Sequence, residues 1–275
     1  MKFGISILCC VLMCSFALAA QNGLIQVKGS DTMVNLGQRW AENYMEKNPD
    51  VNIAVTGGGS GTGFAALIGG SCDVAEVSRK IEQKELDQAK VKGFEPKEII
   101  VALDGLAVVV NLDNQVSGLT MEELKNIFTG KITNWKEVGG KDARITILSR
   151  EVNSGTHVYF KEHVLNKAEF SENALMLPSS QAIADEVSGN PNAIGYYGMG
   201  YIGSSEKAIK VAKDKQSEYV APSAESVKNN KYPISRPLFM YTRGEPSGTV
   251  KDFIDFALSE EGQKIVAELD FVPIK

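Results

Sequence analysis

Short apolar runs alternate along this chain with Gly- and Ser-rich turns and with segments of helical spacing. Three β-rich runs come early, over 24–27, 51–55 and 73–77. Between the first two, Leu36, Trp40 and Tyr44 recur every fourth residue and give a helix with one apolar face, which Pro49 ends. This repeated order predicts an α/β fold with a mostly parallel sheet covered by helices on both faces.

The same alternation continues to the end of the chain. Ile99–Asn111 is longer than a usual strand and is interrupted by Asp104 and Gly105, so we predict that it passes from one lobe to another. A capping box at Thr120–Glu123 opens a helix that is predicted over 121–128. Further strands are predicted over 144–148, 193–198, 207–212 and 238–242, and further helices over 64–68, 82–91, 154–165 and 250–269.

Residues 1–19 have the pattern of a secretory signal peptide. Lys2 supplies the positive charge, Ile5–Leu18 is a nearly uninterrupted apolar stretch, and Ala17-Leu18-Ala19 fits a cleavage site. The stretch is short for a membrane span, which needs about 20 residues. We therefore expect a soluble exported chain that begins at Ala20 and is periplasmic or secreted.

The positions of the cysteines and the net charge argue against several classes of protein. Three of the four Cys lie within the first 19 residues, and the Leu8 and Met13 that precede Cys9 and Cys14 disfavour a lipoprotein. Only Cys72 remains in the mature chain, so no internal disulfide is expected, and with two His a zinc site is not predicted. Removal of Lys2 leaves 28 basic and 34 acidic residues, a charge of −6, which argues against nucleic-acid binding.

Three Gly/Ser/Thr-rich loops each follow a predicted strand and open a predicted helix. They are Gly29–Thr32, Gly59–Gly63 and Ser154–Thr156. A helix N-terminus presents unpaired N–H groups and partial positive charge, so it attracts anions. Arg150 adds a guanidinium that suits a tetrahedral oxyanion. Each loop alone also fits an ordinary turn with a Ser or Thr cap, so the inference depends on all three together.

One feature of the chain suggests catalysis instead of binding. His157 directly follows the third loop, which suggests a secreted hydrolase that uses Ser154 and His157; otherwise His157 is expected on the helix surface. The chain has no G-x-S-x-G elbow, no phosphate-binding P-loop and no dinucleotide fingerprint. We therefore expect no catalytic residues, no cofactor and no metal.

The ordered motifs resemble the phosphate-binding proteins of bacterial phosphate ABC importers, the PstS family, in its shorter branch. The resemblance covers nearly the whole mature chain. It is carried by segments 29–32, 57–63, 75–79, 104–111, 127–135, 150–156 and 272–274. It implies a two-lobe periplasmic binding protein, type II-like, with two hinge crossings near Asp104 and Arg236 and a ligand cleft between the lobes. Lobe 1 would comprise 20–104 and 236–275, and lobe 2 would comprise 105–235.

The resemblance also implies the ligand and the site. The ligand would be inorganic phosphate and the partner a membrane ABC permease, with the protein a monomer that binds no nucleic acid. The implied phosphate-binding residues are Ser30, Asp31, Thr32, Ser60, Ser78, Arg79, Arg150, Ser154, Gly155 and Thr156. A binder of sulfate, molybdate or another oxyanion stays an alternative, as does a surface protein with a vestigial site.

One departure from the family affects selectivity. The other branch carries an Asp where Ser78 falls here, and such a carboxylate accepts the proton of phosphate and repels fully ionised sulfate. With Ser78 in place, Asp31 and then Asp104 are the candidate acceptors. Asp31 is equally suited to cap the following helix. Arg79 is expected either to touch the ligand or to pair with Asp104.

Overall fold

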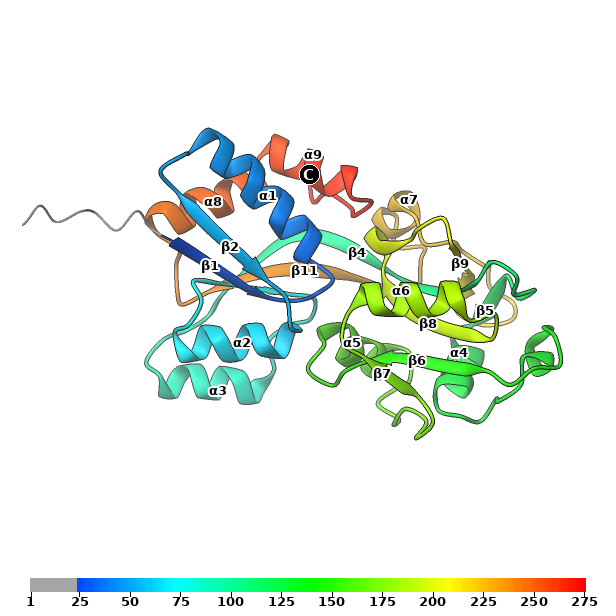
Figure 1. Ribbon diagram of the computed structural model, residues 1–275. Helices are drawn as coiled ribbons and strands as arrows, with labels where there is room; N and C mark the ends of the chain where they lie inside the picture. The colour runs from blue at the N-terminus through cyan, green and yellow to red at the C-terminus, as the bar shows by residue number, and fades with distance from the viewer. Residues whose placement is uncertain (1–23) are drawn as a thin grey trace, which may run out of the picture.

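The computed structural model describes residues 24–275. The predicted signal peptide, its cleavage site and the three early Cys lie outside the described residues. The chain forms two lobes that lie side by side and are joined by two long strands, β4 (Lys97–Asn111) and β11 (Ser235–Thr242) (Figure 1). The two-lobe α/β fold expected from the family resemblance is confirmed.

The first lobe is a sheet between two helical layers. Leu36, Trp40 and Tyr44 of helix α1 (Val34–Lys47) are buried on one face of this sheet, so the predicted apolar face is confirmed. The predicted single helix over 250–269 is wrong: it divides at Ser259, whose hydroxyl accepts from Gly262 N at 3.1 Å and caps the second helix. The elements are β1 (Leu24–Gly29), β2 (Asn52–Thr56) and β3 (Val74–Val77), with α1 (Val34–Lys47), α8 (Gly248–Leu258) and α9 (Glu260–Glu268) above the sheet in Figure 1 and α2 (Ser60–Gly69) and α3 (Gln83–Val91) below it.

The second lobe has its own core, in which Phe128, Phe160 and Tyr196 pack ring against ring. The predicted strand over 207–212 is two short strands on either side of Ile209, and the sequence analysis missed β5 (Gly118–Thr120), β7 (Leu175–Leu177), α6 (Ser180–Gly189) and α7 (Ala224–Lys228). The elements are β5 (Gly118–Thr120), α4 (Met121–Phe128), β6 (Thr146–Arg150), α5 (Gly155–His163), β7 (Leu175–Leu177), α6 (Ser180–Gly189), β8 (Ala193–Gly198), β9 (Glu206–Ala208), β10 (Lys210–Ala212) and α7 (Ala224–Lys228), with single 3₁₀ turns at Trp135–Val138 and Met199–Tyr201.

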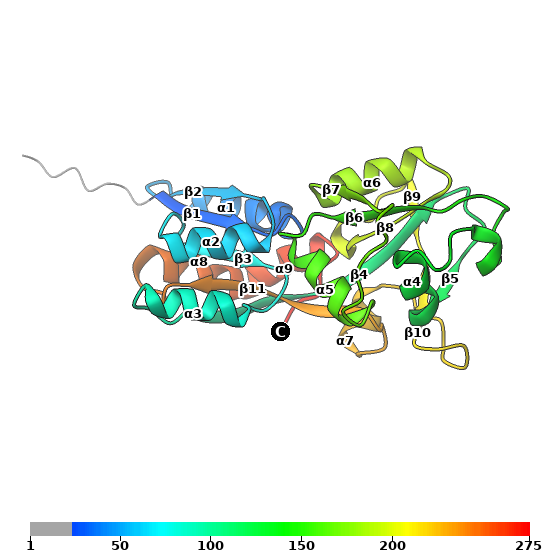
Figure 2. The same cartoon turned by 90° about the horizontal axis from the view of Figure 1, so that it is seen from below.

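The strand β4 contributes to both lobes. Its first part pairs with β11 as far as Gly105, and from Leu106 onward it pairs with β8. Val101 belongs to the core of the first lobe and Val108 to that of the second. The prediction that this run passes between lobes is confirmed, and Figure 2 shows both joining strands from below. The residue boundaries predicted for the lobes stay a prediction.

The prediction of a mostly parallel sheet is only partly right. The strand order is β2-β1-β3-β11-β4-β8-β6-β7, and the strands are parallel within β2-β1-β3 and within β8-β6-β7. Pairing is antiparallel where β11 meets β3 and β4, and where β4 meets β8. The two strands that join the lobes therefore run against their neighbours. In the described part of the chain, no helix is long and apolar enough to cross a bilayer.

Candidate functional site

The three Gly/Ser/Thr-rich loops meet at the boundary between the lobes. The first two follow β1 and β2 of the first lobe and lead into α1 and α2, whereas the third follows β6 of the second lobe and leads into α5. Gly29 lets the first loop pass over β3, because a Cβ there would lie 2.0 Å from the carbonyl oxygen of Glu76, and its φ is +146°. Ser30 N donates to that same carbonyl at 2.7 Å.

Three serines from the first lobe form one buried group, here called the serine cluster: Ser30, Ser60 and Ser78. The Ser30 hydroxyl donates to Ser78 Oγ at 3.0 Å, and Ser78 Oγ lies 3.3 Å from Ser60 Oγ. The backbone N of Ser78 donates to Ser60 Oγ at 3.0 Å. All three side chains are buried, so the serine cluster is a site shielded from solvent where three hydroxyls can each donate or accept a hydrogen bond.

The N-terminus of α5 approaches the serine cluster from the other lobe. A Cβ at Gly155 would lie 2.3 Å from Ser60 Oγ and 2.8 Å from Ser78 Oγ, so only glycine allows this approach. Beside it, Thr156 Oγ1 lies 2.9 Å from Thr32 Oγ1 of the first lobe. The N–H groups of a first helical turn have no acceptor further along the helix, and in α5 the Gly155 N–H is the one that Ser154 does not cap, so it is the donor that α5 offers to the serine cluster.

Ser154 has a structural contact of its own. Its hydroxyl oxygen accepts from the backbone N of Thr156 at 3.2 Å and of His157 at 3.4 Å, as the N-cap of α5. Its hydroxyl hydrogen is still available as a donor. Ser154 therefore fixes the start of α5, in addition to any contact that it makes with a ligand.

Arg150 is 1% exposed and links the lobes through Asp31. Its Nη2 donates to the Asp31 carboxylate at 2.7 Å and to the carbonyl of Pro178 at 2.8 Å, and its Nη1 donates to Ser180 Oγ at 3.2 Å. Burial lowers the pKa of the guanidinium, and the neighbouring Asp31 raises it. The buried Nε has no hydrogen-bond partner in the described part of the chain, so this N–H of the charged guanidinium is free to donate to a ligand.

The alternative that Asp31 caps α1 is wrong. Its Oδ1 accepts from the backbone N of Gly58 at 3.0 Å, so the side chain ties the first loop to the second. Its backbone carbonyl accepts from the Tyr201 hydroxyl at 2.6 Å. The N-cap of α1 is Met33, with no side-chain cap, so the first turn of α1 keeps its donors.

Asp104 pairs with Arg236. The guanidinium donates to Asp104 Oδ2 from Nε at 3.0 Å and from Nη2 at 2.9 Å, and Asp104 Oδ1 accepts from the backbone N of Met199 at 3.1 Å. Burial raises the pKa of Asp104, and Arg236 opposes that rise. Arg236 also donates to Thr156 Oγ1 at 3.0 Å and to the Ser78 carbonyl at 3.1 Å. This arginine therefore contacts both lobes from the hinge.

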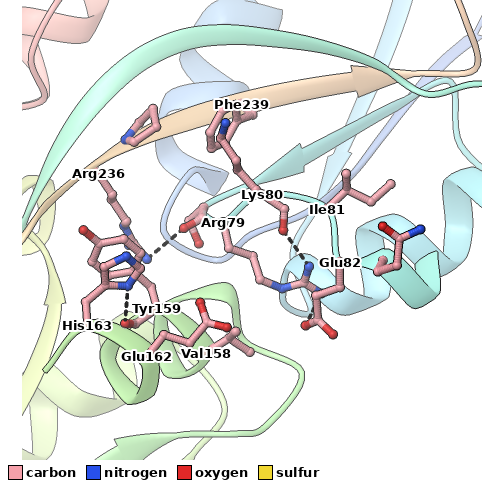
Figure 3. A pocket seen from close by; sticks show the side chains of 13 residues that line it. Arg79, Lys80, Ile81, Glu82, Val158, Tyr159, Glu162, His163, Arg236 and Phe239 are labelled. Atoms are coloured by element: carbon pink, nitrogen blue, oxygen red, sulfur yellow. Dashed lines mark hydrogen bonds and ion pairs between the residues drawn. The ribbon is translucent and has the colours of Figure 1, made fainter. Parts of the chain in front are cut away.

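The expectation that Arg79 pairs with Asp104 is wrong. Arg79 donates to both oxygens of Glu85, at 2.8 and 2.7 Å, and its guanidinium lies over the ring of Phe64. In Figure 3 the Arg79 and Arg236 side chains diverge, and Arg79 points toward Glu82. A ligand contact by Arg79 stays a prediction, which this orientation does not favour.

The sequence analysis did not name Asn153, Tyr201 or Arg236 as site residues, although it placed a hinge crossing near Arg236. Asn153 joins the lobes, because its carbonyl accepts from Gly61 N and its amide donates to the Gly58 carbonyl, both at 2.9 Å. A charged residue before the apolar strand 238–242 was a signal for Arg236. For Tyr201 the sequence held no signal, because only the fold brings it to the first loop.

The proposed surface position of His157 is wrong. Its side chain is buried and packs against Phe170, with ring centres 4.6 Å apart and the ring planes tilted by 31°. Its Nδ1 lies 2.9 Å from the Arg150 carbonyl, an acceptor, so Nδ1 carries the proton. Burial is the main cause that lowers the pKa of this ring. The ring makes no hydrogen bond to Ser154 within the described residues, so the geometry of a Ser–His nucleophile is not formed there.

The charges at the boundary nearly cancel, because Arg150 pairs with Asp31 and Arg236 with Asp104. The electrostatic field that would hold an anion therefore comes from the three helix N-termini and from the free Nε–H of Arg150. Among the residues that the structure describes, no group of three or more His, Cys, Asp or Glu is placed to hold a metal ion. The arrangement can bind a small tetrahedral anion through hydrogen bonds alone.

Comparison with known proteins agrees with this geometry. A family model described as a PBP superfamily domain matches residues 17–261. The phosphate-binding protein PstS of Bacillus subtilis is 37% identical over 257 residues, which cover 92% of this chain and 81% of that protein. PstS of Pseudomonas aeruginosa is 33% identical over 270 residues, which cover 92% of this chain and 84% of that protein.

A similar solved structure is a putative phosphate ABC transporter substrate-binding protein from Clostridium perfringens with bound phosphate. It is 38% identical to this chain, with a TM-score of 0.84. The match covers 92% of this chain and all of that one.

Proposed function

Because the chain belongs to the PBP superfamily and, within it, to the PstS family of phosphate-binding proteins, we propose that it captures inorganic phosphate between its lobes for an ABC importer. The observation that carries this proposal is that the loops before α1, α2 and α5 bring Ser30, Ser60 and Gly155 together with Ser78, while Arg150 pairs with Asp31, the residue after Ser30. N–H groups, hydroxyls and one guanidinium are the donors that a tetrahedral oxyanion requires.

Each predicted phosphate residue except Arg79, which pairs with Glu85, has a role in this proposal. Ser30, Ser60 and Ser78 supply hydroxyls from the first lobe, and Gly155 supplies its N–H from the second. Arg150 supplies its free Nε–H, so it can bind the ligand while its Nη2 stays paired with Asp31. Thr32, Ser154 and Thr156 complete the donor set, and Asp31 holds Arg150 in place.

Capture would work by lobe closure. Contacts between the lobes already run through Asn153, Thr156 and Arg150, each of which reaches a loop of the first lobe. A phosphate bound to donors from both lobes adds contacts that only the closed form makes, so it stabilises that form. The closed form would then dock on the permease.

Selectivity against sulfate needs an acceptor for the phosphate proton. Both oxygens of Asp104 are already hydrogen-bonded, to Arg236 and to Met199, and both oxygens of Asp31 are held by Arg150 and Gly58. Because a carboxylate oxygen can accept more than one hydrogen bond, Asp31 and Asp104 stay candidate acceptors, and the hydroxyls of the serine cluster are further ones. A hydroxyl rotates to donate or to accept, so it discriminates less than a carboxylate does.

The remaining expectations belong to the same proposal. The chain acts outside the cytoplasm after signal cleavage, as a monomer, without enzymatic activity, metal, cofactor or nucleic acid. The binding role itself is tested by isothermal titration of residues 20–275, unfolded and refolded to remove retained ligand. Micromolar or tighter phosphate binding with weaker sulfate binding is expected. No heat and no thermal shift with either anion would contradict the function.

A further inference from the structure

Two residues of the second lobe hold the loops of the first lobe and do not belong to the predicted phosphate contacts. They are Asn153, in the loop between β6 and α5, and Tyr201, at the end of the 3₁₀ turn that follows β8. The strands β6 and β8 are parallel neighbours, so both residues follow the carboxyl ends of adjacent strands. They therefore reach the boundary between the lobes from the same edge of the sheet.

Asn153 fits closely against the second Gly-rich loop. Its side-chain amide donates to the Gly58 carbonyl, and its backbone carbonyl accepts from Gly61 N, both at 2.9 Å. A Cβ at Gly59, where φ is +89°, would lie 2.7 Å from the Asn153 carbonyl oxygen, and a Cβ at Gly61 would lie 3.2 Å from it. Two glycines of this loop therefore make room for a residue of the other lobe.

Tyr201 reaches the first loop, and hydrogen bonds continue from there to Asn153. The Tyr201 hydroxyl donates to the Asp31 carbonyl at 2.6 Å. Asp31 Oδ1 accepts from Gly58 N at 3.0 Å, and the Gly58 carbonyl accepts from Asn153. This path begins and ends in the second lobe and passes through both loops of the first. We call its four residues, Tyr201, Asp31, Gly58 and Asn153, the latch.

The latch leaves the proposed phosphate donors free. It uses the carbonyl and Oδ1 of Asp31, so Oδ2 stays with Arg150. Gly58 takes part through its backbone alone, and neither the serine cluster nor the Gly155 N–H is used. The contacts of Tyr201 and Asn153 join the two lobes, so they exist only while the lobes touch. They therefore stabilise the closed form independently of the phosphate donors.

We propose that Asn153 and Tyr201 are positioning residues that slow the release of phosphate by holding the lobes together, without touching the anion. This rests on the proposed phosphate function. A contact that is made only in the closed form shifts the equilibrium toward that form, so its loss should raise the dissociation rate constant. Phosphate enters before the lobes meet, so the association rate constant should not fall.

The test measures phosphate release from the refolded mature chain, residues 20–275. Radiolabelled phosphate chased with excess unlabelled phosphate gives the dissociation rate constant, isothermal titration gives Kd, and their ratio gives the association rate constant. Asn153→Ala and Tyr201→Phe each remove the side-chain donor of the latch, so each should raise the dissociation rate constant about twofold to tenfold. Asn173→Ala and Tyr219→Phe, at exposed sites, are the matched controls and should release phosphate like the wild type.

Gly61→Val tests the contact from the first lobe. Its side chain would press on the Asn153 carbonyl oxygen, so this variant should also release phosphate faster than the wild type. Gly69→Val lies in the same helix, where a Cβ would meet none of the described residues within 4 Å beyond that helix, and is the matched control. Thermal melts show whether each variant is folded.

The outcomes separate the latch from the phosphate function. Wild-type dissociation rate constants in folded Asn153→Ala, Tyr201→Phe and Gly61→Val would overturn the latch and leave the phosphate function standing. Weaker binding through a lower association rate constant would also overturn it, because these residues would then act on the arrival of phosphate. Absence of phosphate binding by the wild type would overturn the phosphate function as well.

Discussion

Asp104 and Arg236 lie directly opposite each other on the two strands that join the lobes, and their side chains form an ion pair that is almost completely buried. Arg236 also reaches Thr156 of the second lobe and the Ser78 carbonyl of the first. The hinge is therefore connected to the candidate phosphate site by a single side chain.

We expect that replacing only one partner of the Asp104–Arg236 pair strongly lowers the free energy of unfolding. Removal of one partner of a buried pair leaves an uncompensated charge, which costs roughly 3–5 kcal/mol. Arg236→Ala and Asp104→Ala should each lower the free energy of unfolding by about this amount, and the double variant by much less than the sum. Urea denaturation measures all three. Lys136→Ala, in an exposed pair with Asp142, is the control and should change little. Additive losses would contradict this coupling.

Arg150→Ala should weaken phosphate binding by well over tenfold. A hydrogen bond to a charged group contributes roughly 1.5–3 kcal/mol, and this variant also releases Asp31. Isothermal titration gives the change in Kd, and a thermal melt shows whether the variant is folded. Arg39→Ala, at an exposed site on α1, should bind like the wild type. A folded Arg150→Ala protein with wild-type affinity would remove this residue from the site.

Ser78→Asp should sharpen discrimination between phosphate and sulfate. A carboxylate beside Ser30 and Ser60 accepts the phosphate proton and repels sulfate, which has no proton to share. We expect sulfate affinity to fall at least tenfold more than phosphate affinity, measured by titration with both anions. Ser78→Ala separates the new charge from the loss of the hydroxyl. If the wild type already excludes sulfate as strongly as Ser78→Asp does, the serine at position 78 does not limit the selectivity for phosphate over sulfate.

Glu76 should make the protein less stable as pH rises. Its side chain is buried beneath α1, where a Cβ at Gly37 would lie 2.4 Å from Oε2, and burial raises its pKa from 4.5 to about 8. Its Oε1 has no hydrogen-bond partner among the described residues. The folded state therefore binds this proton more tightly than the unfolded state, so the contribution of Glu76 to stability is fully present below pH 4.5 and is lost between pH 4.5 and about 8.

Denaturation of the wild type and of Glu76→Gln at several pH values measures this contribution. Their difference in free energy of unfolding should change with pH by at most about 1.4 kcal/mol per unit across that range. Glu42→Gln, at an exposed site on α1, should reproduce the wild-type pH profile. Parallel profiles for the wild type and Glu76→Gln would show that Glu76 does not titrate there.

The sequence determined the local elements that carry the candidate site. Its Gly/Ser/Thr loops follow β strands and open helices because small residues permit the turns and leave the first helical N–H groups accessible. The helical spacing of Leu36, Trp40 and Tyr44 likewise determined which face of α1 is buried. Such features depend on neighbouring residues and on periodicity, which are readable without a fold.

Only the tertiary structure decided which charges meet. Arg236 lies 132 positions from Asp104, and Arg150 lies 119 positions from Asp31. Arg79 instead pairs with Glu85 only six positions away, because α3 brings that carboxylate beside it. Ion pairs between lobes depend on strand register and on the way the lobes face each other, and no local pattern in the chain encodes either.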